Sequence, residues 1–116
     1  MTGTIVLPWP PRDLHPNARP HHMARARAAK AYRTQAMWIA KAAEIQTAAE
    51  GEIMLDVRFH PPSNRGDTDG MFSACKSAFD GIADAIEVND RRFAFTIRRM
   101  EPSKNGAVFI DVKAGE

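Results

Sequence analysis

The stretch "EIMLDVRFH", Glu52 to His60, decides the fold class. Apolar and polar side chains alternate along it, with Ile53, Leu55, Val57 and Phe59 on one face and Met54, Asp56, Arg58 and His60 on the other. Successive side chains of a β-strand point to opposite faces of its sheet, so this alternation predicts a half-buried strand. We therefore expect a sheet with one face against a core, and helices packed on that face.

Two helices and three further strands are predicted around this strand. The long helix is rich in alanine and contains neither glycine nor proline before Gly51, and the second helix carries apolar residues at helical spacing. "EPSKNG", which contains Asn105-Gly106, predicts a hairpin turn between the last two strands. The expected elements are strands at 4–9, 52–60, 92–100 and 107–114 and helices at 23–49 and 70–87. The order β-α-β-α-β-β predicts an α+β fold, a mixed sheet with two helices on one face.

The composition predicts a single globular domain over residues 1–116. Hydrophobic residues make up 44% of the chain and charged residues 26%, which argues against general disorder. The single cysteine, Cys75, excludes an intramolecular disulfide and a cysteine-rich zinc site, which is typical of a reducing cytoplasm. No apolar run is long enough for a membrane span, and the N-terminus lacks the pattern of a secretion signal. We therefore expect a cytoplasmic protein without a membrane partner.

The basic residues are unevenly distributed. No acid occurs between Asp13 and Glu44, where the chain carries Arg19, Arg25, Arg27, Lys30, Arg33 and Lys41. Basic blocks without interleaved acids suit the phosphate backbone of a nucleic acid. The alternative is a solvated helix face without a partner.

Five aspartates gather in "SNRGDTDGMFSACKSAFDGIADAIEVND", Ser63 to Asp90. Asp67 and Asp69 are two residues apart, so in an extended segment their side chains point to the same side and can reach one divalent cation. Without a cation the two carboxylates repel each other. Asp69 has an alternative role as the N-cap of the helix expected to start at Gly70.

The predicted second helix adds polar groups to this pair. Asp69, Ser73, Lys76 and Asp80 follow at spacings of four, three and four residues, which places them on one helix face. Asp90 comes just after the helix, and it can join Asp67 and Asp69 if the following strand lies beside the one that ends near Pro61. For Asp80 we expect an ion pair with Lys76 or a supporting role beside the metal ligands.

Together these motifs resemble the RusA family of Holliday junction resolvases, of the prophage type. "LPWPP" near the N-terminus, D-x-D before a helix, "K-x-x-F-D" within it and an aspartate about ten residues later occur in the family's order over nearly the whole chain. The resemblance implies Mg²⁺ binding by Asp67, Asp69 and Asp90, with Mn²⁺ as a substitute, and a role in cleavage for Lys76. It also implies a homodimer that resolves four-way DNA junctions by paired symmetric nicks, in DNA recombination and repair.

Four features depart from the family pattern. Lys76 lies seven residues after Asp69, about a turn later than in the best-known member, although prophage-type relatives show this longer spacing. Gly70 stands where an asparagine commonly follows D-x-D, Asn89-Asp90 replaces a usual pair of aspartates, and the arginine run before D-x-D is reduced to Arg65. The expected DNA contacts are Arg19, Arg25, Arg27, Lys30, Arg33 and Arg65. Two alternatives remain open: a non-catalytic module of the same fold that binds branched DNA, and a metal-binding or structural domain unrelated to DNA.

Three other residues are assigned to the core. Trp9 and Trp38 each sit among apolar residues, which favours packing over stacking on DNA bases. Cys75 lies on the apolar stripe of the second helix, so we interpret it as a small buried residue and not as a nucleophile.

Overall fold

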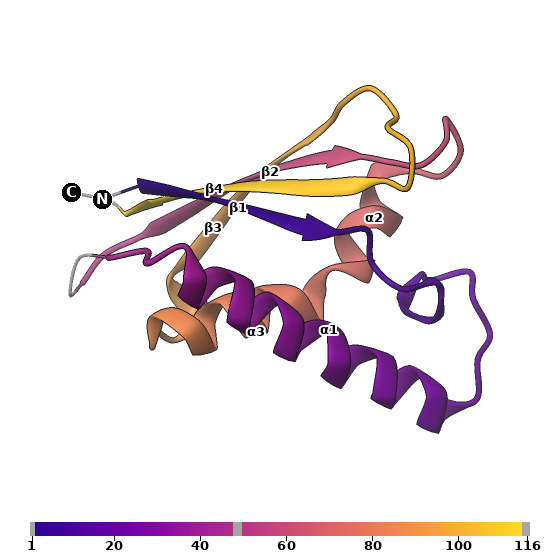
Figure 1. Ribbon diagram of the computed structural model, residues 1–116, viewed down its shortest axis with the longest axis horizontal. Coiled ribbons are helices and arrows are strands. Elements are labelled where there is room, and N and C mark those ends of the chain that lie inside the picture. Colours follow the sequence, from indigo (N-terminus) through magenta and orange to yellow (C-terminus); the bar gives the residue numbers. More distant parts are fainter. Residues whose placement is uncertain (1, 48–49, 115–116) are drawn as a thin grey trace.

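Four strands form one mixed sheet in the order β1-β4-β2-β3 (Figure 1). The computed structural model describes residues 2–47 and 50–114. Strand β4 runs antiparallel to both of its neighbours, whereas β2 and β3 are parallel. The strands are β1 (Thr2–Pro8), β2 (Ile53–His60), β3 (Phe93–Arg99) and β4 (Ala107–Ala114).

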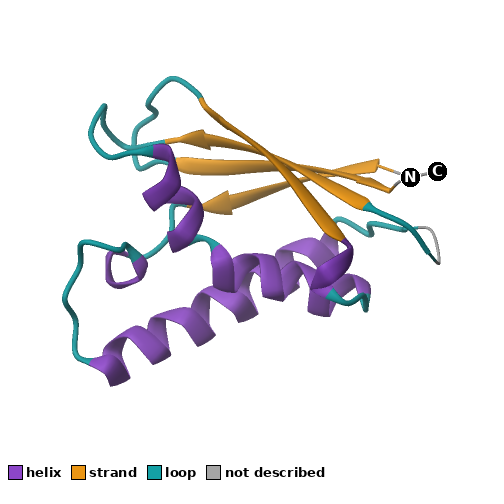
Figure 2. Ribbon diagram, turned by 180° about the vertical axis from the view of Figure 1, so that it is seen from behind, coloured by secondary structure: helices purple, strands orange, loops and turns teal. Residues whose placement is uncertain are grey.

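The helices lie on one face of this sheet (Figures 1 and 2). They are α1 (His22–Ala42), α2 (Thr68–Ala74) and α3 (Lys76–Ile86), with short 3-10 helices η1 (Arg12–Leu14) and η2 (Asp90–Arg92). The sheet contributes the fully buried residues Ile5, Leu7, Ile53, Leu55, Val57, Phe59, Val108, Ile110 and Val112. Strand β2 alternates between buried and half-buried along its whole length. This arrangement confirms the predicted α+β fold with helices on one face. Among the described helices, none has the length and apolar character needed to cross a membrane.

The predicted hairpin between β3 and β4 is wrong, because β2 lies between these two strands. Asn105 and Gly106 do form a turn, with backbone φ angles of 70° and 72°. The turn reverses the chain, but the connection from β3 to β4 also passes the end of β2. As a result, β4 pairs with β2 on the side opposite β3. A turn motif specifies only its own local geometry, so it could not identify β2 as the strand between the two.

The long helix is shorter than the sequence predicts. α1 ends at Ala42, and Glu44 adopts a left-handed backbone with φ of 52°. This bend turns the chain back to the sheet, where a Cβ at Gly3 would lie only 2.8 Å from the Ile45 side chain. Ile45 cannot both continue the helix and pack against β1. The observed structure has the packing, so the helix ends before Ile45. The remainder of the predicted helix includes residues 48–49, which lie outside the described part.

The second predicted helix is divided in two at Cys75. This residue ends α2 and precedes α3, with φ of −94° and ψ of 0°. Its thiol is fully buried and lies 3.9 Å from the Tyr32 hydroxyl, which also donates a 2.7 Å hydrogen bond to the Pro8 carbonyl. Burial raises the pKa of Cys75 to about 12, against a smaller lowering by the Tyr32 hydrogen bond. The thiol is thus protonated and shielded, and its assignment to the core is confirmed.

Trp38 is exposed, contrary to its predicted place in the core. Its exposed fraction is 60%, and Lys41 lies 5.1 Å above its ring. The buried residues of α1 are Tyr32, Ala36 and Ala40, one helical turn apart. Trp38 falls midway between the last two, which on a helix is the opposite side. An apolar neighbourhood in sequence therefore did not indicate the buried face of this helix.

Gly81 sets the distance between α1 and α3. A Cβ at this position would collide with the backbone carbonyl of Arg33 and lie 3.1 Å from the Met37 nitrogen. Replacing glycine by alanine in a helix usually stabilises it by up to about 1 kcal/mol. Here we expect the opposite sign: Gly81→Ala should lower the free energy of unfolding by about 2 kcal/mol, because backbone atoms cannot move aside as a flexible side chain can.

Ser77→Ala on the same helix is the matched control. The Ser77 hydroxyl is buried without a hydrogen-bond partner among the described residues, so its removal should leave stability unchanged or raise it. Urea unfolding followed by circular dichroism measures both variants. Equal stability of Gly81→Ala and the parent protein would contradict the assigned close contact.

Candidate functional site

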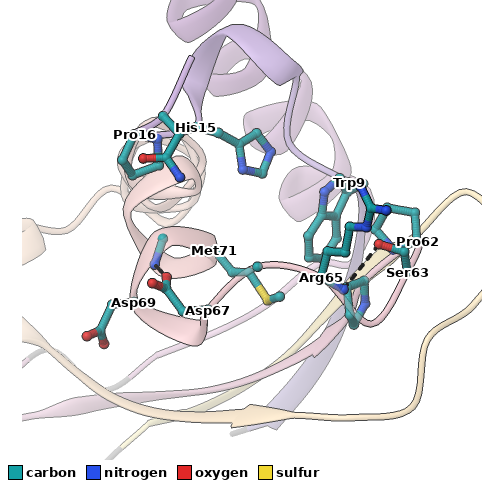
Figure 3. Close-up of a pocket in the computed structure, with 13 residues that line it drawn as sticks. Trp9, His15, Pro16, Pro62, Ser63, Arg65, Asp67, Asp69 and Met71 are labelled. Atoms are coloured by element: carbon teal, nitrogen blue, oxygen red, sulfur yellow. Dashed lines mark hydrogen bonds between the residues drawn. The ribbon is translucent and has the colours of Figure 1, made fainter.

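One pocket of about 660 Å³ brings together segments that are far apart in the sequence (Figure 3). The chain after β1 supplies Trp9 and His15, the loop after β2 supplies Arg65, and the start of α2 supplies Asp67 and Asp69. The remaining lining residues are Pro16, Asn17, Pro61, Pro62, Ser63, Gly66, Gly70 and Met71. The "PWPP" segment and the D-x-D pair therefore belong to the same site.

Asp67 is the N-cap of α2, a role that sequence analysis had considered for Asp69. The Oδ1 atom of Asp67 accepts a 2.7 Å hydrogen bond from the Gly70 nitrogen, and its backbone is extended. Among the described residues, no hydrogen bond engages its Oδ2 atom. Asp69 lies in the first turn of the helix and is exposed. The helix begins earlier than predicted, which moves the capping position from Asp69 to Asp67.

Trp9 forms one wall of the pocket. Its ring stacks on His15 with centroids 6.2 Å apart and meets Phe59 edge-on. A Cβ at Gly106 would lie 2.9 Å from the Trp9 ring, so the turn after β3 can approach it only because this position is glycine. Trp9 is half-buried and packs against the core, as predicted. The position of Trp9 in the wall of the pocket was not predicted. The loop that follows it, with the sequence "HPN", was the signal that could have indicated a site there.

Lys76 lies at the junction of the two short helices. It is the first residue of α3 and is exposed. Because the helix is interrupted at Cys75, the face predicted to carry Asp69, Ser73, Lys76 and Asp80 is not continuous. Lys76 and Asp80 both lie in the described part of the chain, and no ion pair joins them.

Asp80 instead belongs to a second, smaller pocket with Asp84, Asp90 and Arg33. Arg33 donates two hydrogen bonds to the Asp84 carboxylate, of 2.7 and 2.9 Å. This pairing lowers the pKa of Asp84. The pKa of Asp80 is raised, chiefly by burial and also by the Asp90 and Asp84 carboxylates, while Arg33 acts in the opposite direction. These acids therefore share one arginine.

The expectation that Asp90 joins Asp67 and Asp69 is not met within one chain. Strand β3 does lie beside β2, but the two are parallel, with Phe93 opposite Ile53 and Arg99 opposite Phe59. Asp90 precedes β3, whereas Asp67 follows β2, so they lie near opposite ends of the pair, roughly 20 Å apart for a seven-residue strand. Within residues 2–47 and 50–114, no group of three or more His, Cys, Asp or Glu residues is placed to hold a metal ion.

The predicted DNA contacts divide into three groups. Arg19, Arg27, Lys30 and Arg65 are exposed. Arg25 is half-buried and donates a 3.1 Å hydrogen bond to the Ala18 carbonyl. Arg33 is held by Asp84, so it is not an independent phosphate contact as the sequence suggested. Arg99, which was not predicted to take part, donates to the carbonyls of Gly66 and Arg65 beneath the pocket loop.

Comparison with known proteins finds a relative but no family. No family model matches the chain. An uncharacterized protein of Xylella fastidiosa (strain Temecula1 / ATCC 700964) is 40% identical over 94 residues. The match covers 78% of this chain and 61% of the relative, so the chain spans about three fifths of the protein that it matches.

The two roles of Asp67 can be separated by substitution. Asp67→Ala removes the cap and should lower the free energy of unfolding by about 1 kcal/mol, whereas Asp67→Asn keeps a capping oxygen and should be nearly neutral. Asp69→Ala is the control, because the exposed Asp69 side chain does not cap the helix. Thermal unfolding of the three variants measures the difference. A similar loss in Asp69→Ala would contradict the assignment of the cap to Asp67.

Proposed function

We propose that this protein is a Mg²⁺-dependent endonuclease of the RusA type that resolves four-way DNA junctions by paired symmetric nicks, in DNA recombination and repair. The observation that carries the proposal is the shared pocket of the "PWPP" segment and the D-x-D pair, two motifs of the resemblance that are more than fifty residues apart. Such an enzyme would act on DNA in the cytoplasm, in keeping with its single, unpaired cysteine.

The D-x-D pair fits a hard divalent cation. Carboxylate oxygens are the ligands that Mg²⁺ and Mn²⁺ prefer, and Asp69 together with Oδ2 of Asp67 would supply them. A bound cation would neutralise phosphate charge and favour attack by water on the scissile phosphorus. The capping bond from Gly70 fixes the orientation of Asp67 and so limits the directions in which its free oxygen can point.

Lys76 and the surrounding arginines would handle the phosphate. Lys76 is exposed at the junction of α2 and α3, where its ammonium group can neutralise charge on the scissile phosphate. Arg65 lies in the loop that lines the pocket, and Arg19, Arg27 and Lys30 extend the positive charge along α1 and the segment before it. Contacts of this kind position DNA without reading its sequence. Asp80 would act only through its neighbours Asp84, Asp90 and Arg33.

The third acid of the proposed metal site requires a second copy of the chain. Asp90 lies near the opposite end of β3 from the D-x-D pair, so one chain alone cannot assemble Asp67, Asp69 and Asp90. A homodimer in which each D-x-D pair faces Asp90 of the other copy would contain two complete sites related by two-fold symmetry. Two symmetric sites match the two symmetric nicks that a four-way junction needs.

A nicking assay tests the activity. With Mg²⁺ and a labelled four-way junction, the parent protein should nick two strands, and Asp69→Asn should reduce the rate at least about 100-fold because a ligand charge is lost. Its junction binding, measured by gel shift, should be unchanged or tighter, since negative charge beside DNA is removed. Loss of binding together with nicking would point to misfolding.

Two further variants complete the comparison. Lys76→Ala should suppress nicking and keep binding, and a normal rate would exclude this lysine from the reaction. The double variant Arg27→Ala with Lys30→Ala is the contrast: it should weaken binding and flatten its salt dependence, because fewer counterions are released.

The alternative is a module of the same fold that binds branched DNA without cutting it. The separation of Asp90 from the D-x-D pair within one chain favours this alternative, as does Gly70 in place of the usual asparagine. A parent protein that shifts the junction in a gel but never nicks it, with either Mg²⁺ or Mn²⁺, would establish the binding module and overturn the nuclease.

Complementation between two inactive variants tests the shared site. Asp69→Asn and Asp90→Asn should each be inactive alone. When they are mixed by unfolding and refolding, a mixed dimer regains one intact site, because unmutated Asp67 and Asp69 of one copy meet unmutated Asp90 of the other. We expect single-strand nicking to reappear, up to about one quarter of parent activity per protein at random assortment.

The result distinguishes the two possible arrangements. If each site used Asp90 of its own chain, every mixed dimer would contain two damaged sites and the mixture would stay inactive. Refolding each variant alone is the control, and nicking that appears in either control would invalidate the comparison.

A further inference from the structure

The outward face of α1 carries a tryptophan that belongs neither to the core nor to the pocket with the D-x-D pair. Trp38 is 60% exposed, the largest fraction among the exposed large apolar side chains of residues 2–47 and 50–114. An indole ring in this position gives up the burial that places most tryptophans in a core or an interface. Lys41 lies 5.1 Å from its ring centroid, a cation–π distance. The exposed ring is therefore available to a flat partner, with a positive charge beside it.

The residues in line with Trp38 form a stripe along the helix. Positions three or four apart share a face of an α-helix, and a run of such spacings extends over most of α1. This stripe consists of Met23, Arg27, Lys30, Thr34, Trp38 and Lys41, all exposed. It is roughly 27 Å long at 1.5 Å per residue. The buried residues Tyr32, Ala36 and Ala40 lie on the opposite side, so the stripe points away from the core.

The positive charge of the stripe is not neutralised by the described part of the chain. The sequence of α1 contains no aspartate or glutamate. Among the described residues, no ion pair engages Arg27, Lys30 or Lys41. Arg25 and Arg33, which lie off the stripe, are instead hydrogen-bonded within the chain. The cations of the basic block that can meet an external polyanion are thus the ones aligned with the exposed ring.

We propose that this stripe binds single-stranded DNA, with an unpaired base stacked on Trp38 and neighbouring phosphates held by Lys41, Lys30 and Arg27. An aromatic ring accepts any base because every base has a π face, and a line of positive groups follows the backbone. A base inside a duplex is already stacked on both sides, so only an unpaired base can use Trp38. This binding requires neither a metal ion nor nicking, and only the choice of DNA over RNA rests on the proposed function.

The chemistry of the stripe favours this occupant over a membrane or a protein. A helix that lies in a membrane surface inserts a continuous apolar face, whereas α1 turns its buried residues towards the core. Met23 and Trp38 are roughly 22 Å apart along the helix axis, with Arg27 and Lys30 between them. They therefore do not form the contiguous apolar patch that marks a protein interface. Separate aromatic and cationic groups match the alternating bases and phosphates of one strand.

The fluorescence of Trp38 tests the stacking directly. The chain contains two tryptophans, so Trp9→Phe leaves Trp38 as the single indole emitter. Titration with an oligothymidine of about twelve nucleotides, in EDTA so that no nicking occurs, should quench this emission saturably. A strand of equal length built from abasic residues, and a duplex of equal length, should bind by charge without comparable quenching. Absence of quenching by oligothymidine, or equal quenching by the abasic strand, would overturn the proposal.

A binding measurement in which Trp9 is retained makes the test independent of the Trp9→Phe variant. The anisotropy of labelled oligothymidine should show that Trp38→Ala binds at least about fivefold more weakly than the parent protein, because one stacked base is lost. Met23→Ala is the matched control, since Met23 is exposed on the same stripe but has no aromatic ring, and it should bind like the parent protein. Equal affinities of Trp38→Ala and the parent protein would contradict a stacked base.

Other ligands and the nicking assay separate the remaining outcomes. Tighter binding of oligouridine, of phosphatidylglycerol vesicles or of polyaspartate than of oligothymidine would assign the stripe to RNA, a membrane or an acidic protein, and would overturn the proposal. Binding of oligothymidine through Trp38 by a protein that never nicks a junction would leave the stripe standing and overturn the nuclease. Nicking by a protein whose Trp38 does not respond to oligothymidine would do the reverse.

Discussion

The parallel pairing of β2 with β3 is the constraint on which the rest of this structure depends. Two parallel neighbours cannot be joined by a tight turn, so the chain must cross from the end of one strand to the start of the other. Here the crossover consists of a loop, α2, α3 and η2. It carries the D-x-D pair at its beginning and Asp90 at its end. Asp90 is therefore separated from the D-x-D pair by about the length of a strand.

The sequence was a good guide to the elements and a poor guide to their neighbours. The alternation in β2 arises because one face of the strand is buried, so the polarity of each residue alone indicates its side. The observed strand at Ile53–His60 matches this alternation. The position of β2 between β3 and β4 depends on contacts across the whole chain, which the Asn105-Gly106 turn does not encode. For the same reason the end of α1 was missed, since Ile45 leaves the helix to pack on β1.

The candidate site shows the same division. The position of Asp67 and Asp69 at the start of a helix was predictable from local pattern, although the exact start of α2 decided which of them caps it. The meeting of Trp9 with this pair was not, because the two segments touch only in the folded chain. Arg33 was assigned to DNA by its place in a basic block, whereas its charge is taken up by Asp84 on α3. Charge counted along a sequence cannot reveal a partner fifty residues away.

Tyr32 has a further consequence for how the parts of the molecule move. Its phenol connects the middle of α1 to the last residue of β1 and to the break between α2 and α3. The proposed DNA-binding helix and the two segments on either side of the acidic pocket are therefore joined through a single buried ring. Because the hydroxyl contacts both segments, a displacement of that helix would act on both of them together.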